Sequence, residues 1–201
     1  MSTDAEFSKN QLRTIALFGT SADPPTAAHR DILEWLSAHY DWVAVWASDN
    51  PFKHHETSLK HRMAMLKLLI ESIDTPRKNI SFHEELSYLR SLLSLAKAKE
   101  IWGVEVEYTL VIGSDLIKQM RQWYQVEELL KQVQILILPR PGHVIEEEDL
   151  AALQVIGGNY AIADLKLPDV SSTAYRKTQD QSLVLPAIKD YICQENLYTS
   201  I

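Results

Sequence analysis

The sequence predicts an α/β fold, a doubly wound and mostly parallel sheet with a small helical part at its C-terminal end. Candidate strands alternate with candidate helices along most of the 201 residues, and this order implies helices on both faces and right-handed crossovers. Several strands are unbroken apolar runs, as expected of strands covered on both faces. Polar residues follow the strands, at the edge where such sheets bind ligands. We expect a single domain over 1–201, with a Rossmann-like core over 10–168 and a helical segment over 169–201.

The prediction of a functional site depends on the first strand and the helix that follows it. An apolar run that ends at Gly19 predicts a strand over 13–19. The two prolines at 24–25 cannot extend a sheet ladder but suit a first helical turn, which predicts a helix over 25–39. His29 then lies about one turn into that helix, where free backbone N–H groups and the helix dipole favour an anion.

Five further strands are expected from short apolar runs. The second strand, DWVAVWAS, is followed by Asp49, Asn50 and Pro51, which break it. The fourth and fifth, EYTLVI and VQILIL, are followed by Gly-Ser-Asp and by Pro-Arg-Pro-Gly. Because parallel strands present their carboxyl ends at one edge, we expect these loops to lie near one another. The five strands are expected over 41–48, 79–84, 107–112, 133–138 and 159–165.

The intervening helices are expected from N-caps and from apolar residues at helical spacing. Thr57 or Ser58 caps a helix whose buried stripe includes Leu66 and Leu69. A leucine-rich helix is expected from Ser87. Its core-facing stripe is predicted to consist of Leu89, Leu92, Leu93 and Ala96. Further helical segments are expected after Asp115, through Leu130, from Glu146, from Val170 and over 184–196.

The composition is that of an ordinary globular protein and narrows the class of function. The net charge of −7 argues against general nucleic-acid binding, which basic patches drive, although a local basic pocket for a small anion stays compatible with it. Cys193 is the single cysteine, so no internal disulfide can form and a reducing compartment is expected. The sequence shows neither a signal-peptide core nor a membrane span. We therefore expect a cytoplasmic protein without nucleic-acid or membrane partners.

Two motifs place polar side chains at helix amino ends. Thr26 and His29 form T-x-x-H on one turn, so both side chains can face the same anion. The motif S-S-T-x-x-R over 171–176 combines hydroxyls, backbone N–H groups and a guanidinium, a set that can hold a polyphosphate. Each motif also has a plain structural interpretation, a solvated histidine in the first case and an ordinary N-cap with a surface arginine in the second. Similarly, Gly-Ser-Asp over 113–115 can be a simple tight turn.

The sequence lacks the patterns that are typical of several common enzyme chemistries. His54 and His55 are adjacent and Cys193 is remote from every histidine, so no zinc cage is expected. The chain has no G-x-S-x-G elbow and no nucleophile with an obvious base. It also lacks G-x-x-x-x-G-K-[ST] and G-x-G-x-x-G, which excludes a typical P-loop protein and a typical dinucleotide dehydrogenase.

Taken in order, the motifs resemble a known family. GTSADPPTAAH, DNPFKH, IGSD, Trp123, PRPG and SSTAYR resemble, over roughly 13–198, the nicotinate/nicotinamide mononucleotide adenylyltransferases, nucleotidyltransferases of the HxGH type. That family's pattern runs G-G-[ST]-F-D-P-x-H-x-G-H, N-P-x-x-K, I-G-x-D, W, R-P-G and I-S-S-T-x-[IV]-R. The segment SYLRSLL resembles the family's S-Y-T-x-x-T-L only loosely, and Lys53 stands one place before the family's lysine, with His54 nearby. Other departures are Thr20, Ala22, Thr26 and Ala28.

The resemblance implies a Rossmann-like nucleotidyltransferase fold and adenylyl transfer from ATP to a pyridine mononucleotide, with Mg²⁺ bridging the ATP phosphates and no dedicated protein metal site. It implies that His29, Thr26 and Arg176 act at the reacting phosphates. The implied ATP-binding residues are Gly19, Thr20, Ser21, His29, Gly113, Asp115, Ser171, Ser172, Thr173 and Arg176. The implied mononucleotide-binding residues are Ser21, Asp23, Lys53, Trp123 and Arg140, with Trp123 stacked on the pyridine ring.

Nicotinate mononucleotide is the acceptor we expect, with deamido-NAD and pyrophosphate as products. One alternative is the same chemistry on nicotinamide mononucleotide or on another phosphate acceptor such as phosphopantetheine. A second alternative is a non-catalytic nucleotide-binding relative, which the departures at Thr20, Ala22 and Ala28 motivate. The sequence leaves the choice between acid and amide open, and it leaves a homo-oligomeric state open as well.

Overall fold

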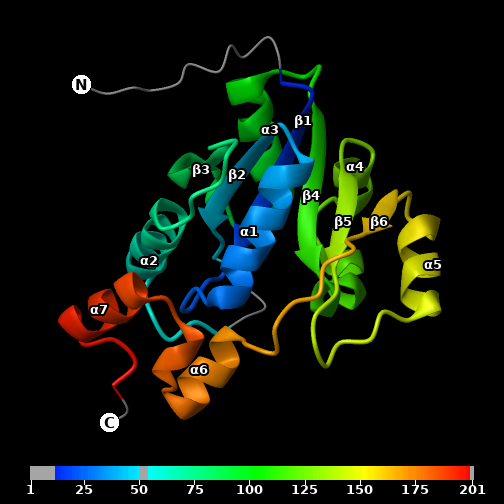
Figure 1. Ribbon diagram of the computed structural model, residues 1–201. Helices are drawn as coiled ribbons and strands as arrows, with labels where there is room; N and C mark the ends of the chain where they lie inside the picture. Colours follow the sequence, from blue (N-terminus) through cyan, green and yellow to red (C-terminus); the bar gives the residue numbers. More distant parts are fainter. Residues whose placement is uncertain (1–11, 50–53, 200–201) are drawn as a thin grey trace, which may run out of the picture.

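The computed structural model describes residues 12–49 and 54–199, and it contains the expected doubly wound sheet (Figure 1). The strands are parallel and lie in the order β3-β2-β1-β4-β5-β6. This order reverses between β1 and β4, so the switch point of the sheet lies where these two strands end. The strands are β1 (Thr14–Thr20), β2 (Trp42–Ala47), β3 (Ile80–Phe82), β4 (Glu107–Gly113), β5 (Gln134–Leu138) and β6 (Tyr160–Ile162).

Helices cover both faces of this sheet, and β1 divides its side chains between them. Ala16 and Phe18 belong to one buried cluster, whereas Ile15 and Leu17 belong to the other, as the period of a strand requires. The first cluster is covered by α1 (Ala27–His39), α2 (Leu59–Glu71), α6 (Ser172–Thr178) and α7 (Pro186–Gln194). The second is covered by α3 (Ser91–Trp102), the 3-10 helix η3 (Ser114–Gln122), α4 (Val126–Leu130) and α5 (Glu147–Val155).

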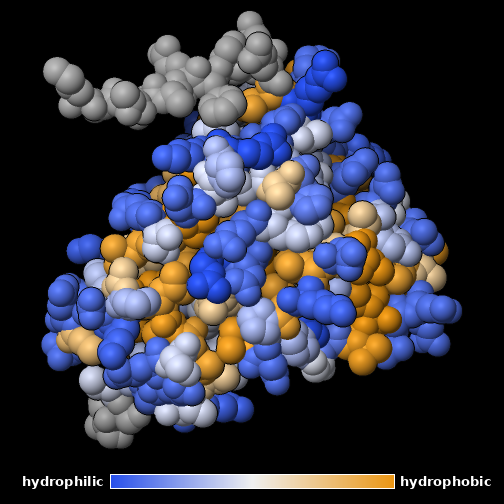
Figure 2. Space-filling view, viewed as in Figure 1, coloured by the Kyte–Doolittle hydropathy of each residue, from blue (hydrophilic) through white to orange (hydrophobic). Residues whose placement is uncertain are grey.

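The helix α1 is amphipathic and lies directly over β1 in Figure 1. Its inner side buries Ile32, Leu33 and Leu36, while Glu34 and His39 are exposed. Figure 2 shows the same view with hydrophilic residues over the outer side of α1 and hydrophobic residues in the gaps beside it. The predicted helix is therefore present, but it begins at Ala27 and not at residue 25, so both prolines precede it. Its burial holds the amino end of α1 close to the end of β1.

The prediction for the leucine-rich helix was wrong about its start and its buried face. Residues Glu84–Leu86 form a short 3-10 helix, η2, and α3 begins only at Ser91. Leu89 and Leu93 are exposed, whereas Ser94, Leu95 and Ala98 are the buried residues of α3. Leucines occur on both sides of this helix, so apolar spacing did not identify the core face. Ser94 is buried at little cost because its hydroxyl donates to the Leu86 carbonyl at 2.7 Å.

The two edge strands are shorter than the sequence predicts. β3 and β6 each pair with one neighbour only, so less of each run is ordered into a ladder. Asn79, expected to begin the third strand, uses its buried side chain to donate to the carbonyls of Ser37 and Tyr40 at 3.1 and 2.9 Å. That side chain joins the end of α1 to the sheet, while the backbone carbonyl of Asn79 accepts from the Val43 N–H of β2 at 2.9 Å.

The C-terminal helices complete the core that α1 and α2 begin. Tyr175 of α6 and Ile188 and Ile192 of α7 are buried in the same cluster as Phe18. Residues 181–183 form the 3-10 helix η4, and the last helix covers Pro186–Gln194, within the range predicted for it. Within the described ranges, each helix is too short or too polar to cross a bilayer.

Candidate active site

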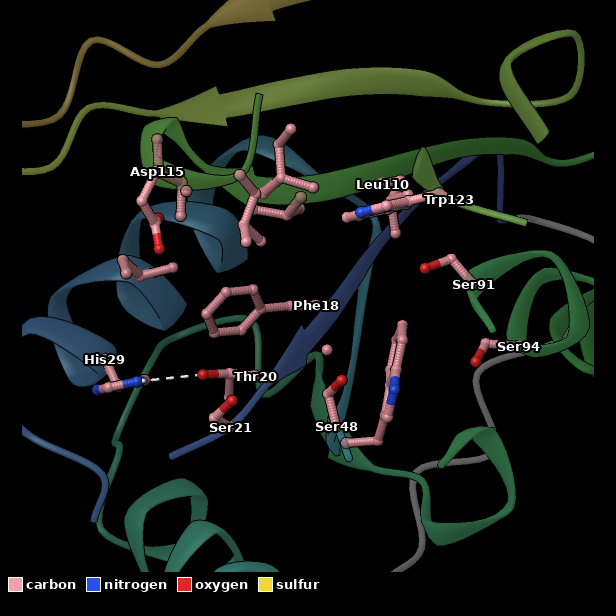
Figure 3. A pocket seen from close by; sticks show the side chains of 18 of the residues that line it. Phe18, Thr20, Ser21, His29, Ser48, Ser91, Ser94, Leu110, Asp115 and Trp123 are labelled. Atoms are coloured by element: carbon pink, nitrogen blue, oxygen red, sulfur yellow. Dashed lines mark hydrogen bonds between the residues drawn. The ribbon is translucent and has the colours of Figure 1, made fainter. Parts of the chain in front are cut away.

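A cavity of about 300 Å³ lies at the switch point, where β1 and β4 end. The predicted ATP-binding residues that line it are Gly19, Thr20, Ser21, His29, Gly113, Asp115 and Ser171. Of the predicted mononucleotide-binding residues, Ser21, Trp123 and Arg140 line it. In Figure 3, Thr20, Ser21 and His29 lie at one side of the cavity, which we call the histidine end. Trp123 and Ser91 lie at the opposite side, and we define the tyrosine end as Tyr88, Arg90, Trp123 and Tyr124.

The imidazole of His29 is oriented by the first turn of its own helix. The backbone N–H of Thr26, the N-cap residue of α1, donates to Nδ1 at 3.1 Å. Since Nδ1 accepts this bond, the proton of the neutral ring resides on Nε2. Nε2 lies 3.2 Å from the Thr20 hydroxyl oxygen at the end of β1 (Figure 3). His29 therefore presents an N–H donor at the wall of the cavity, in a position that the sequence predicted.

The amino end of α1 adds a further attraction for anions at the histidine end. The helix has 13 residues, has no acidic residue in its first turn and begins where Thr20 and Ser21 line the cavity. Its free N–H groups and dipole favour negative charge near that end. Ala28, which replaces a glycine of the family pattern, lines the cavity with its methyl group.

His55 is a residue of this end that the sequence reasoning did not single out. Its Nε2 lies 3.1 Å from the Ser21 hydroxyl oxygen, and its Nδ1 lies 3.6 Å from an Asp49 carboxylate oxygen. The order of the motif pointed to Lys53 and His54 instead. Lys53 lies outside the described residues.

Gly113, Asp115 and Arg140 form a compact group at the end of β4. Arg140 Nη1 donates to an Asp115 carboxylate oxygen at 3.1 Å. A Cβ atom at Gly113 would collide with that carboxylate and lie 2.8 Å from the Arg140 side chain. A glycine is thus required for the ion pair to pass this close to the backbone. The close approach explains why a glycine directly follows the fourth apolar run.

Gly19 has the same role at the end of β1. A Cβ atom there would lie 2.6 Å from the indole ring of Trp46, which is 3% exposed and lines the cavity from β2. The absence of a side chain at Gly19 lets the indole ring lie against the backbone of β1. The sequence did not predict this place for Trp46, because a tryptophan in an apolar run does not reveal which cavity it faces.

The tyrosine end is built from two segments far apart in the sequence. Tyr88 and Arg90 come from the loop before α3, and Trp123 and Tyr124 follow η3. The guanidinium carbon of Arg90 lies 4.0 Å from the centre of the Tyr124 ring. The sequence predicted only Trp123 here, although Tyr88 and Arg90 belong to the segment SYLRSLL, which loosely resembles a family motif. Three of these side chains are exposed, so no apolar periodicity pointed to them.

The motif S-S-T-x-x-R lies next to the histidine end, and one of its residues lines the cavity. Ser171 lines the cavity and caps α6 by accepting from the Ala174 N–H. Ser172 donates to the Pro24 carbonyl at 2.8 Å, and Arg176 Nη1 donates to the Asp23 carbonyl at 2.6 Å. Arg176 also pairs with Glu56 at 3.1 Å. The two motifs therefore meet across 23–26, although Thr26, Ser172, Thr173 and Arg176 do not themselves line the cavity.

Asp23 supports the site instead of lining it, which differs from its predicted place in the mononucleotide pocket. Its side chain is 2% exposed and does not reach the cavity. One carboxylate oxygen accepts from the Glu56 N–H at 2.7 Å, and the other accepts from the hydroxyls of Thr57 and Tyr198 at 2.7 and 2.5 Å. The sequence of the proline-rich turn could not reveal these partners. Glu56 and Thr57 lie just before α2, and Tyr198 lies near the end of the chain.

Arg62 joins the loops that follow β1 and β2. Its side chain is 1% exposed, and Nη1 donates to the carbonyls of Ser21 and Ser48 at 3.1 and 2.6 Å. Nη2 donates to Asp49 at 2.8 Å. Burial lowers the pKa of this guanidinium, and the charge of Asp49 opposes that effect. Arg62 was not predicted, since an arginine within a helix ordinarily points to solvent.

The described residues contain no group of three or more histidine, cysteine, aspartate or glutamate side chains that could hold a metal ion. Asp115 is the carboxylate that lines the cavity, and it is paired with Arg140. The arrangement offers hydroxyls, N–H donors and cations, and the hydroxyl of Ser21 is hydrogen-bonded to His55. This arrangement can bind phosphates and stabilise negative charge that develops on them.

The chain matches the family model described as cytidylyltransferase-like over residues 17–178. It is 48% identical to a Synechocystis protein named "Probable nicotinate-nucleotide adenylyltransferase", with 92% of this chain and 98% of that relative covered. It is 29% identical to the nicotinate-nucleotide adenylyltransferase of Bacillus subtilis, with 94% and 100% covered.

The fold is also that of a solved structure, the Plasmodium falciparum nicotinic acid mononucleotide adenylyltransferase complexed with NaAD. The TM-score is 0.77 and the identity is 23%, with 92% of this chain and 97% of that chain covered. The likeness places the observed sheet and its flanking helices among nucleotidyltransferase folds, as the sequence predicted.

Proposed function

The chain belongs to the cytidylyltransferase-like family and, within it, to the nicotinate-nucleotide adenylyltransferases, and we propose that its cavity is the active site of this activity. It is a nucleotidyltransferase of NAD biosynthesis. It transfers the adenylyl group of ATP to nicotinate mononucleotide and yields deamido-NAD and pyrophosphate. The observation that carries the assignment of the site is the His29 Nε2–H donor, held at the amino end of α1 where the strand order reverses.

The chemistry needs positioning and charge stabilisation more than proton transfer. The attacking group is the phosphate of the mononucleotide, which is already ionised at neutral pH. Its oxygen forms a bond to the α-phosphorus of ATP while the bond to pyrophosphate breaks. His29 donates from Nε2 to the phosphate oxygens as charge develops on them, and the N–H groups of α1 add to this stabilisation. Because the substrate phosphate is itself the nucleophile, the reaction needs no nucleophile from the protein.

The C-terminal motif supplies the outer part of the triphosphate site. Ser171 faces the cavity as the N-cap residue of α6, and Ser172 and Thr173 are the first two residues of that helix. Arg176 contacts Glu56 and the carbonyl of Asp23 beside the histidine end. We expect its guanidinium to exchange Glu56 for an oxygen of bound ATP. Thr26 then acts through His29, whose Nδ1 it holds by a backbone N–H.

The remaining cavity residues bind the two nucleosides. Asp115 accepts from ribose hydroxyls of the adenosine, and Gly113 lets the substrate approach the backbone of β4. Trp123 stacks on the pyridine ring, and Ser21 and Arg140 face the mononucleotide. These roles are supported by the position of each residue on the cavity wall. Asp23 takes a supporting role here, because its carboxylate is buried against Thr57 and Tyr198.

Magnesium is expected to accompany ATP. The cavity fits this arrangement, because Asp115, the one carboxylate among its described lining residues, is bound to Arg140 and the hydroxyls of Thr20 and Ser21 can hold water. When bound, the ion neutralises charge on the phosphates. The protein's own contribution is to hold the triphosphate with His29, the amino end of α1 and the residues of α6. A cytoplasmic location and a homo-oligomeric state remain predictions.

The test is an acceptor panel. ATP is incubated with nicotinate mononucleotide, nicotinamide mononucleotide, phosphopantetheine or no acceptor, and pyrophosphate release is followed. We expect nicotinate mononucleotide to give the highest kcat/KM. A higher kcat/KM with another acceptor would show that the proposed substrate is wrong and that the proposed chemistry is right. ATP binding by calorimetry without pyrophosphate from any acceptor would instead identify a non-catalytic relative.

A further inference from the structure

The tyrosine end of the cavity holds a positive charge that the transfer chemistry does not use. Arg90 is the N-cap residue of α3 and lines the cavity, with its guanidinium carbon 4.0 Å from the centre of the Tyr124 ring. A cation over an aromatic face is attracted by the ring quadrupole, and the planar guanidinium can stack there while its N–H groups point outward. Tyr124 therefore restricts where Arg90 can lie without neutralising its charge.

Arg90 also differs from the other arginine that lines the cavity. Arg140 is held by the Asp115 carboxylate at 3.1 Å. Across residues 12–49 and 54–199, by contrast, no carboxylate lies within ion-pair distance of Arg90. The donors of Arg90 are thus available to an anion that enters the cavity, whereas Nη1 of Arg140 already donates to Asp115.

The charges in the cavity are separated along its length. His29 and the amino end of α1 are at the histidine end, and Arg90 is at the tyrosine end, joined in the chain to Ser91 on the far side of Figure 3. Trp123 lies on that same side. The arrangement suits a ligand that has a phosphate at one end and a second anionic group attached to a flat ring at the other.

We propose that Arg90 is a specificity-determining residue that binds the carboxylate of nicotinate mononucleotide and thereby makes the enzyme prefer the acid to the amide. This inference rests on the proposed function and identifies how its acceptor is chosen. A guanidinium can donate two parallel N–H bonds to a carboxylate. A carboxamide is neutral, offers one acceptor oxygen and turns an N–H₂ group towards the donors of Arg90.

The experiment compares kcat/KM for the two mononucleotides at saturating ATP in the full chain and in Arg90→Met. Methionine keeps much of the side-chain bulk and removes the charge. We expect kcat/KM for nicotinate mononucleotide to fall about tenfold to a hundredfold, mainly through KM, as for loss of a charge-assisted bond. We expect the value for nicotinamide mononucleotide to stay within about threefold of the wild type. The ratio of the two values should therefore collapse.

Two further variants separate recognition from structure. Arg90→Lys keeps the charge but loses the two-pronged geometry, and it should restore part of the preference for the acid. Arg13→Met is the matched control, an exposed arginine that directly precedes β1, at the sheet edge opposite the cavity. Arg13→Met should leave kcat/KM for both mononucleotides unchanged. Thermal unfolding of each variant checks that Arg90→Met remains folded.

The outcomes decide the inference independently of the proposed function. Equal losses on both acceptors, or no loss on either, would overturn the role of Arg90 while adenylyl transfer stands. If the wild type releases pyrophosphate with neither acceptor, the proposed function fails. The same variants are then compared by calorimetric binding of nicotinate and nicotinamide mononucleotides. A preference for the acid that Arg90→Met does not reduce, or no preference at all, would overturn the inference there too.

Discussion

The histidine end and the tyrosine end of the cavity are built in different ways. At the histidine end, Thr20, Ser21 and His29 come from one strand–turn–helix unit, and the ring of His29 is fixed by a residue three positions away. At the tyrosine end, side chains from before α3 and after η3 meet across more than thirty residues of chain, and Arg90 and Tyr124 are exposed.

The difference matches the two tasks of the proposed reaction. Charge stabilisation at a phosphate needs fixed N–H donors, because donors that must reorganise during the reaction contribute less. A short stretch with local hydrogen bonds provides such donors. Choice of the acceptor depends on one substituent of a flat ring, and exposed side chains can read it without disturbing the core. We therefore expect the two ends to give different kinetic signatures when they are altered.

The largest effect is expected from His29→Ala at the histidine end. The variant loses the Nε2–H donor, so kcat should fall about 10²- to 10³-fold, as for the loss of one preorganised donor. KM for the mononucleotide should change little. The control is His39→Ala in the exposed last turn of the same helix. Near-normal turnover in a folded His29→Ala protein would remove His29 from the mechanism.

A smaller and kinetically distinct effect is expected from Trp123→Ala at the tyrosine end. Stacking of a flat ring on an aromatic side chain contributes about 1–3 kcal/mol, so KM for the acceptor should rise about tenfold to a hundredfold. KM for ATP should stay the same. Trp35→Ala is the control, because Trp35 stacks on His39 outside the cavity. A rise in KM for ATP of the same size would contradict the separation of the two ends.

Tyr198→Phe tests whether the hydrogen bond from Tyr198 to Asp23 supports the histidine end. Burial raises the pKa of the Tyr198 hydroxyl, so the group stays protonated and donates to Asp23. Its loss should lower the free energy of unfolding by about 1 kcal/mol and raise KM for ATP a few fold, since Asp23 also holds Arg176. Tyr191→Phe, which loses a bond to His61, is the control. Unchanged ATP kinetics would limit Asp23 to a structural role.

The smallest effect on activity is expected at the opposite edge of the sheet. Burial would raise the pKa of Asp41, but N–H donors of Arg13 and Thr14, the Thr14 hydroxyl and the charge of Arg77 together lower it. A lowered pKa in the folded state stabilises the fold above the unfolded pKa of about 4, and this contribution is lost as the pH falls. Asp41→Asn should therefore flatten the acid side of the stability profile and leave both KM values unchanged. A change in either KM would contradict the expectation that Asp41 and the cavity are independent of each other.

The parallel sheet and the positions of Thr20, Ser21 and His29 could be predicted because both depend on short stretches of sequence. The alternation of apolar runs with helical segments implied the parallel sheet, and Gly19 and Gly113 marked the ends of the two strands beside the cavity. The prediction for α3 was wrong because leucines lie on both of its sides, and only packing against Ile15 and Leu17 selects Leu95 and Ala98. The place of Asp23 could not be predicted, because its partners Thr57 and Tyr198 are distant in the chain.

By itself, the sequence determined that this protein has a doubly wound sheet and that His29 lies in the first turn of the helix after β1, since those features depend on hydrogen bonds and periodicities within a few residues. Only the tertiary structure decided that Arg90 and Tyr124 meet, that Arg62 joins two loops, and that Arg176 contacts Asp23 from 153 positions away. The physical reason is that such contacts form only when the crossovers bring the strand ends together at one edge of the sheet.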